Sequence, residues 1–261
     1  MSYRDNGYVS RVGYSQQFSA GGAGIVVDPH WDNLLAGYLM DETNDLNNYQ
    51  DRADVQGVYT LTDVEGDGNG GVGGTPSDTG VNGNAANVYA PGSSDARFLR
   101  QTSGPSVAGG DLFMAFWLKC GALPGRIQLY SSYTSPTENF SSSMFQSGPF
   151  YYLRFTYNGQ PATDTTQWTS RGGTTAFQLI YAWFDSADGY VRMQINNGSI
   201  FTSAGTTTAI SGTLQKFLVG YDSYISEQNS YFDGLYLFNE IKDTDWRTAH
   251  YNGGAGRVWP L

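Results

Sequence analysis

The chain contains few of the side chains that usually catalyse reactions. Its 261 residues include two histidines, His30 and His250, and a single cysteine, Cys120. A serine hydrolase needs a histidine base beside an activated serine, which commonly sits in a Gly-x-Ser-x-Gly turn between a strand and a helix. No such motif occurs in the sequence. We therefore predict that both histidines are surface or packing residues and that the chain is not an enzyme.

Aromatic side chains in loops offer a different chemistry, because their flat faces stack on sugar rings while neighbouring Asn, Asp and Gln side chains bond the hydroxyls. The chain has 19 Tyr, 14 Phe and 6 Trp. Many of these must lie in the core. Five that fall in or beside predicted loops form the candidate ligand-binding set: Tyr130, Tyr133, Trp168, Tyr221 and Tyr224.

Residues 1–24 form a separate segment with aromatics of its own. Its large side chains are Tyr3, Tyr8, Tyr14 and Phe18, spread among Gly, Ser, Gln and Asn with no period of 2 or 3.6. A glycine-rich stretch at residues 21–24 ends the segment like a hinge. We predict an anchoring arm whose aromatics dock on its own domain, on a sister subunit or on another protein.

Charge and hydropathy exclude two classes of partner. The chain carries 14 Lys and Arg against 24 Asp and Glu, a formal net charge of −10, and a field of that sign repels nucleic-acid backbones. Nowhere do about 18 apolar residues run together, as a membrane helix requires. The N-terminus also lacks the apolar stretch of a secretory signal. We expect no nucleic-acid partner, no membrane span and synthesis in a cytoplasm.

Composition predicts an all-β fold that positions these side chains. The 34 glycines and 15% aromatic residues suit short strands joined by tight turns. The predicted strands are residues 34–40, 112–118, 126–130, 150–157 and 177–184. Residues 112–118 are apolar on both faces, as in a central strand covered on both sides. Residues 63–83 and 131–143 are predicted to be surface loops, and Cys120 a small buried hydrophobe.

The last third of the chain has the clearest local signals. Residues 190–195 alternate in polarity and residues 200–201 continue the pattern beyond Asn197-Gly198, which predicts a two-residue hairpin turn with positive φ. Residues 243–251 predict the single helix, capped by Asp243 or Thr244. Together these elements predict one β-sandwich over residues 25–261.

Several segments, in order, resemble the LamG-like jelly rolls of the concanavalin A-like lectin and glucanase superfamily. They are residues 37–42, 83–89, 97–99, 113–119, 182–185, 232–239 and 251–256. The resemblance covers about residues 31–261 and implies a two-sheet antiparallel β-sandwich with a short C-terminal helix. Residues 1–24 match nothing in that family.

The resemblance also bears on catalysis and metal binding. Glucanases of this superfamily carry Glu-x-Asp-x-x-Glu, but here Glu65-Gly66-Asp67 is followed by Gly70 where the last Glu would stand. Related jelly rolls often hold a structural Ca²⁺, and the resemblance places its ligands at Asp41, Asp51 and Asp233. The alternative is that Asp233 caps a turn and Asp41 bonds local amides.

Jelly rolls of this form occur in bacteriophage structural proteins and in secreted bacterial proteins. Because the arm is unmatched, we favour a non-enzymatic virion component, made in the host cytoplasm: a capsid decoration, head fibre or tail-associated protein. Its partners would be capsid or tail proteins and sister subunits in a homo-oligomer. The alternative is a carbohydrate-binding adhesion module that recognises host-surface glycans, and a glycoside hydrolase is a third, weaker hypothesis.

Overall fold

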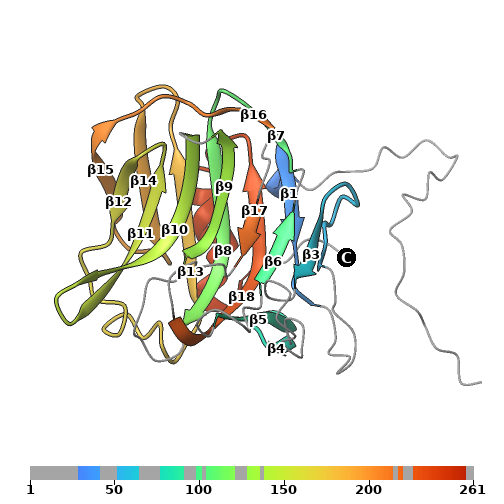
Figure 1. Cartoon of the computed structure of the whole chain (residues 1–261), viewed down its shortest axis with the longest axis vertical. Helices are drawn as coiled ribbons and strands as arrows, with labels where there is room; N and C mark the ends of the chain where they lie inside the picture. Colours follow the sequence, from blue (N-terminus) through green and yellow to red (C-terminus); the bar gives the residue numbers. More distant parts are fainter. Residues whose placement is uncertain are drawn as a thin grey trace, which may run out of the picture.

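The computed structural model describes residues 29–41, 52–64, 77–90, 98–101, 104–120, 128–135, 138–213, 217–219 and 226–256. These residues form two antiparallel eight-stranded sheets that face each other, as Figure 1 shows, and a two-stranded ribbon. The predicted all-β sandwich with one short C-terminal helix is thereby confirmed. Among the described helices, none is long and apolar enough to cross a bilayer.

The strand order of each sheet follows from the hydrogen-bonded pairs. The first sheet runs β15 (Ile200–Thr206), β14 (Tyr190–Ile195), β13 (Gln178–Phe184), β8 (Leu112–Cys120), β18 (Ser226–Phe238), β5 (Asn84–Ala90), β4 (Ser77–Thr79), and β1 (Leu34–Tyr38) also pairs with β18. The second runs β12 (Gln160–Thr163), β11 (Phe150–Tyr157), β10 (Glu138–Ser147), β9 (Gln128–Ser135), β17 (Phe217–Val219), β6 (Phe98–Gln101), β3 (Thr60–Val64), β2 (Arg52–Ala53). The ribbon joins β16 (Ser211–Thr213) to β7 (Ser106–Ala108).

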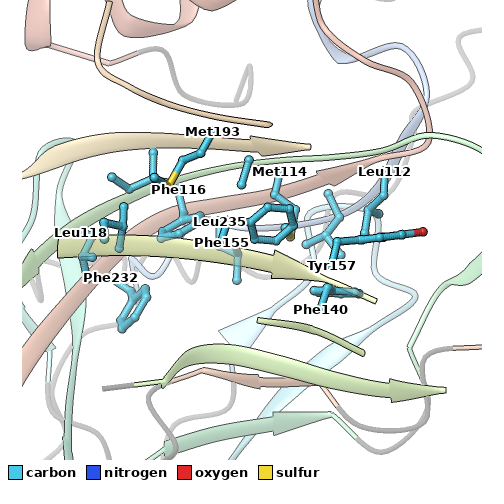
Figure 2. Close-up of a cluster of buried hydrophobic side chains, with 14 of the residues drawn as sticks. Leu112, Met114, Phe116, Leu118, Phe140, Phe155, Tyr157, Met193, Phe232 and Leu235 are labelled. Carbon is cyan, nitrogen blue, oxygen red and sulfur yellow. The ribbon is translucent and has the colours of Figure 1, made fainter. Parts of the chain in front are cut away.

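The main core lies between the sheets and is built on β8. Met114, Phe116 and Leu118 alternate along this strand and pack with Phe155 and Tyr157 of β11, as Figure 2 shows. Successive side chains of a strand point to opposite faces, so the intervening residues of β8 face away from the second sheet. Phe113, Ala115 and Trp117 are buried too, which explains why the strand is apolar on both faces up to Leu118, before the partly buried Lys119.

A second, smaller core covers the outer face of the first sheet. Phe113, Trp117 and Tyr181 lie there, beneath α1 (Thr244–Tyr251) and the short 3₁₀ turn η1 (Pro29–Trp31). A further 3₁₀ turn, η2 (Asn252–Gly254), follows α1. Asp243 caps α1, because its side chain accepts a hydrogen bond from the Trp246 amide at 2.8 Å. The predicted helix and its cap are confirmed.

Two local predictions are wrong. Residues 131–143 are not a loop: most of them belong to β9 and β10, which pair with each other. The turn between β14 and β15 has its positive φ at Asn196 (52°) and not at Gly198. The cause is the Asn196 side chain, whose Oδ1 accepts from the Leu179 amide and whose Nδ2 donates to Gln178 Oε1, each at 2.8 Å. These bonds to β13 hold Asn196 in the left-handed conformation, one position before the predicted Asn197-Gly198 pair.

Candidate functional site

The two histidines lie together in the smaller core. His30 Nε2 and His250 Nδ1 are 3.0 Å apart, and both rings stack on Trp246 with centroids 4.3 and 4.6 Å away. His250 is fully buried and His30 is only 6% exposed. Both therefore pack the helix onto the first sheet, as the sequence predicted of packing residues.

Two of the three predicted calcium ligands, Asp41 and Asp233, meet at the turn between β4 and β5. Asp233 Oδ2 accepts hydrogen bonds from the amides of Val81 at 2.6 Å and Asn82 at 3.1 Å. Asp41 Oδ1 accepts from the amide of Asn84 at 3.0 Å. The two carboxylates thus hold one short turn from two different segments of the chain.

The turn fits closely around these carboxylates. A Cβ added to Gly80 would lie 2.6 Å from Asp233 Oδ2, and one added to Gly83 would collide with Asp41 Oδ1. Burial raises the pKa of the Asp233 carboxyl from 3.8 to about 6; the Asp41 carboxylate adds to the rise, while the backbone amides oppose it. Asp233 is therefore a buried acid whose charge is stabilised mainly by amide groups.

The contacts that the structure describes for the Asp41 and Asp233 carboxylates are hydrogen bonds to backbone amides. Ca²⁺ takes about six to eight oxygen ligands, whereas the described residues contain no group of three His, Cys, Asp or Glu side chains that could hold a metal. The third predicted ligand, Asp51, lies outside the described residues. The observed bonds match the alternative stated above, in which Asp233 caps a turn and Asp41 bonds a local amide.

Trp168 is not available to a ligand. It was predicted to be a loop residue for sugar stacking, but it is fully buried and belongs to the main core. Its loop, residues 164–177, is bonded to both sheets: the Trp168 amide donates to the Tyr151 carbonyl of β11 at 2.9 Å, and the Gly173 carbonyl accepts from the Cys120 amide of β8 at 3.1 Å. A bidentate ion pair between Arg171 and Asp164 braces this loop. The sequence placed Trp168 correctly in a loop but could not show that the loop turns inward.

The remaining predicted residues fall into two groups. Tyr130 and Tyr133 lie on β9, where the register pairs them with Ser142 and Asn139 of β10, so they are strand residues and not loop residues. The others lie outside the described residues: Tyr221, Tyr224, Tyr3, Tyr8, Tyr14 and Phe18. Their predicted roles stay predictions.

A candidate binding surface lies on β10, β11 and β12, on the face turned away from the first sheet. Along β11, Leu153 and Phe155 are buried in the core, whereas Tyr152 and Arg154 on the opposite face are partly exposed. No described helix or strand covers this face, which is turned toward the viewer in Figure 1. Its outward side chains between residues 141 and 163 are Ser141, Ser143, Phe145, Ser147, Phe150, Tyr152, Arg154, Thr156, Pro161 and Thr163. We call this surface the β10–β12 face.

The strand register arranges these side chains in rows. Phe145 lies opposite Tyr152. In the next row Ser143 lies opposite Arg154, and Arg154 lies opposite Thr163. Successive rows on one face are about 6.8 Å apart, since a strand rises by about 3.4 Å per residue and only alternate residues share a face. An aromatic row therefore adjoins a row in which hydroxyls flank a cation.

The Arg154 guanidinium is oriented by both rows. Its Cζ lies 3.5 Å from the centre of the Phe145 ring, and its Nε donates to Thr163 Oγ1 at 3.2 Å. Arginine stacks well on aromatic rings and presents its N–H donors in a fixed plane. The face thus combines aromatic surface, hydroxyls and an oriented fork of donors, which suits a polar ligand with apolar patches.

This face differs from the sequence prediction, which placed the ligand-binding aromatics in loops. The signal was present in residues 150–157, Phe-Tyr-Tyr-Leu-Arg-Phe-Thr-Tyr, where a period of two separates one set of side chains from the other. Both sets contain aromatics, however, so polarity alone does not say which set faces outward. Only the position of the second sheet decides that question.

No protein-family model and no curated protein matches the chain. Solved structures do match. The binding domain of botulinum neurotoxin DC in complex with SialylT has a TM-score of 0.60 at 12% identity over 86% of this chain and 52% of that chain. The receptor binding domain of botulinum neurotoxin D has a TM-score of 0.58 at 12% identity, over 86% of this chain and 54% of that chain.

A third match comes from work on the cell entry of botulinum neurotoxin type C, which depends on interaction with two ganglioside molecules. Its TM-score is 0.59 at 12% identity, over 85% of this chain and 51% of that chain. The chain thus spans about half the length of each matched neurotoxin chain. At this identity the likeness shows the fold alone, an antiparallel β-sandwich. These three matched structures are neurotoxin domains and do not bear on the resemblance of the sequence to jelly rolls of bacteriophage proteins.

Proposed function

We propose that the chain is a non-catalytic, lectin-like module that binds carbohydrate across the β10–β12 face. The observation that carries the proposal is the aromatic pair Phe145 and Tyr152 beside the hydroxyl-flanked Arg154, on a sheet face that no described element covers. Sugars have apolar faces that stack on aromatic rings and hydroxyls that bond to polar side chains. This surface offers both in adjacent rows.

The structural neighbours support a carbohydrate ligand. Matched neurotoxin binding domains were solved in complex with SialylT and with N-acetylneuraminic acid, and the cell entry of type C neurotoxin depends on interaction with two ganglioside molecules. Those ligands belong to chains about twice as long as the matched region, so the likeness supports the class of ligand and not the position of the site. The position rests on the geometry of this chain alone.

The placement of the titratable groups favours binding over catalysis. His30 and His250 are buried under α1 on the first sheet, on the side of the sandwich away from the β10–β12 face. Asp41 and Asp233 are bonded to backbone amides. A glycosidase would need two carboxyl groups flanking the scissile bond, and the outward side chains of the β10–β12 face include no Asp or Glu.

A glycan array probed with a multimeric form of the protein tests the proposal, because multivalency raises weak affinities to a measurable level. Tyr152→Ala should weaken binding to the best glycan at least about tenfold, a loss of about 1.4 kcal/mol. Tyr152→Phe keeps the ring and should bind nearly normally. Val58→Ser, at a residue 64% exposed in the turn between β2 and β3, serves as a control elsewhere on the surface. Absence of any bound glycan would refute the proposal.

The sequence supports a further proposal about where the module acts. We propose that residues 1–24 anchor it to a bacteriophage particle, with capsid or tail proteins and sister subunits as its partners. The support is the LamG-like form of residues 31–261 and the aromatic arm that lies outside it. Deletion of residues 1–24 should abolish incorporation into particles while leaving glycan binding intact. Normal incorporation of the truncated chain would contradict the anchoring role.

A further inference from the structure

Arg154 is the one cation among the outward side chains of the β10–β12 face, and it indicates a narrower class of carbohydrate ligand. Arg154 lies in the middle of a row on the central strand of the three, between Ser143 and Thr163. Its guanidinium is stacked on Phe145 and bonded to Thr163 Oγ1. Both contacts restrict the side chain before a ligand arrives, which lowers the entropy lost on binding.

From this geometry we propose that the face selects glycans that carry a carboxylate, such as uronic or sialic acids. This rests on the proposed function. A guanidinium matches a carboxylate better than any other sugar substituent, since its planar fork donates parallel N–H bonds to both oxygens. Ser143 and Thr163 place hydroxyls on either side of that fork, where they can bond the ring hydroxyls next to the carboxylate.

The spacing of the rows fits this arrangement. The aromatic row, Phe145 and Tyr152, lies about 6.8 Å along the strands from the Arg154 row. The Arg154 side chain spans that distance, since its Cζ lies 3.5 Å from the centre of the Phe145 ring. The guanidinium therefore meets the aromatic row, and a sugar ring stacked on the neighbouring Tyr152 would bring its carboxylate to it. Stacking and charge would then act on the same oligosaccharide.

The overall charge of the chain shows that such selection must be local. With a net charge of −10 the chain repels anions at long range. An acidic glycan is therefore not steered to the surface, and any preference for it has to come from direct contact at Arg154. A single substitution there should remove the preference.

Matched ligand pairs test this inference on the full chain. The probes are hexagalacturonate and its methyl ester, in which the carboxylates are blocked, together with sialyllactose and lactose. We expect the wild type to bind the acidic member of at least one pair at least about tenfold more tightly than its neutral partner. Arg154→Gln should equalise the pair by weakening only the acidic ligand, and Arg154→Lys should restore part of the preference.

Three results would overturn the inference. If acidic and neutral partners bind equally and Arg154→Gln changes neither, the carboxylate preference is wrong while carbohydrate binding stands. If the acidic preference is present but survives in Arg154→Gln, the selecting residue lies elsewhere. If no glycan of either kind binds, the proposed function fails and the inference fails with it. Thermal melting of each variant confirms that the chain remains folded.

Discussion

The buried acid at the β4–β5 turn gives a prediction whose sign and size follow from the structure. Asp233→Asn replaces a carboxylate that accepts two backbone amides with a neutral amide of the same shape. Its carbonyl oxygen still accepts from Val81, so the turn should form. The variant, however, no longer takes up a proton at this position.

The pH dependence follows from the raised pKa. Burial raises the pKa of Asp233 from 3.8 to about 6, so the folded chain binds this proton more tightly than the unfolded chain does. The resulting stabilisation is complete below pH 3.8 and is lost as the pH rises through 6. At about 1.4 kcal/mol per pH unit the total loss is about 3 kcal/mol, of which about 2 kcal/mol falls between about pH 4.5 and 7.5.

Urea unfolding of both proteins at these two pH values measures the effect. The free energy of unfolding of the wild type minus that of Asp233→Asn should fall by about 2 kcal/mol as the pH rises from about 4.5 to 7.5. Taking the difference cancels the titration of the other acidic groups. Asp245→Asn, at an exposed position in the first turn of α1, should show no such change relative to the wild type. A constant difference between wild type and Asp233→Asn would refute the argument that burial dominates at Asp233.

Three further predictions concern the rest of the scaffold. Trp168→Ala should lower the free energy of unfolding by about 3–5 kcal/mol, because it leaves a cavity in the main core; a loss below about 1 kcal/mol in urea unfolding would show that the loop does not close the sandwich. Gly173→Ala should cost about 1–3 kcal/mol, since its Cβ would overlap the Trp168 indole. Gly110→Ala, with open space around it, should change stability by less than about 0.5 kcal/mol, and equal effects of the two would contradict the packing. Because Asp41 and Asp233 are bonded to amides, chelator and added Ca²⁺ should leave the melting temperature unchanged, and a clear rise with Ca²⁺ would support the three-aspartate site instead.

Much of the fold could be predicted because its signals are local. The apolar run at residues 112–118 and the capped helix at 244–251 each follow from their own sequence. The predicted geometry of the turn at Asn197-Gly198 was wrong for a different reason. Its geometry is decided by bonds from Asn196 to β13, which is distant along the chain, and no turn propensity contains that information.

The candidate site was less accessible to sequence reasoning. The sequence prediction that Asp41 and Asp233 lie close together is correct. Only the structure shows that backbone amides donate hydrogen bonds to their carboxylates. Trp168 illustrates the opposite error, since a loop tryptophan is expected to be exposed until its loop is seen to cover the core. The row of Ser143, Arg154 and Thr163 comes from three strands in register, which no single segment of sequence reveals.

A crystal structure of the full chain with its best array glycan tests the central claim most directly. We predict that the sugar lies on the β10–β12 face, with one ring stacked on Tyr152 and polar groups bonded to Arg154 and Thr163. A glycan bound at the loops of the sandwich, or on the side covered by α1, would contradict it.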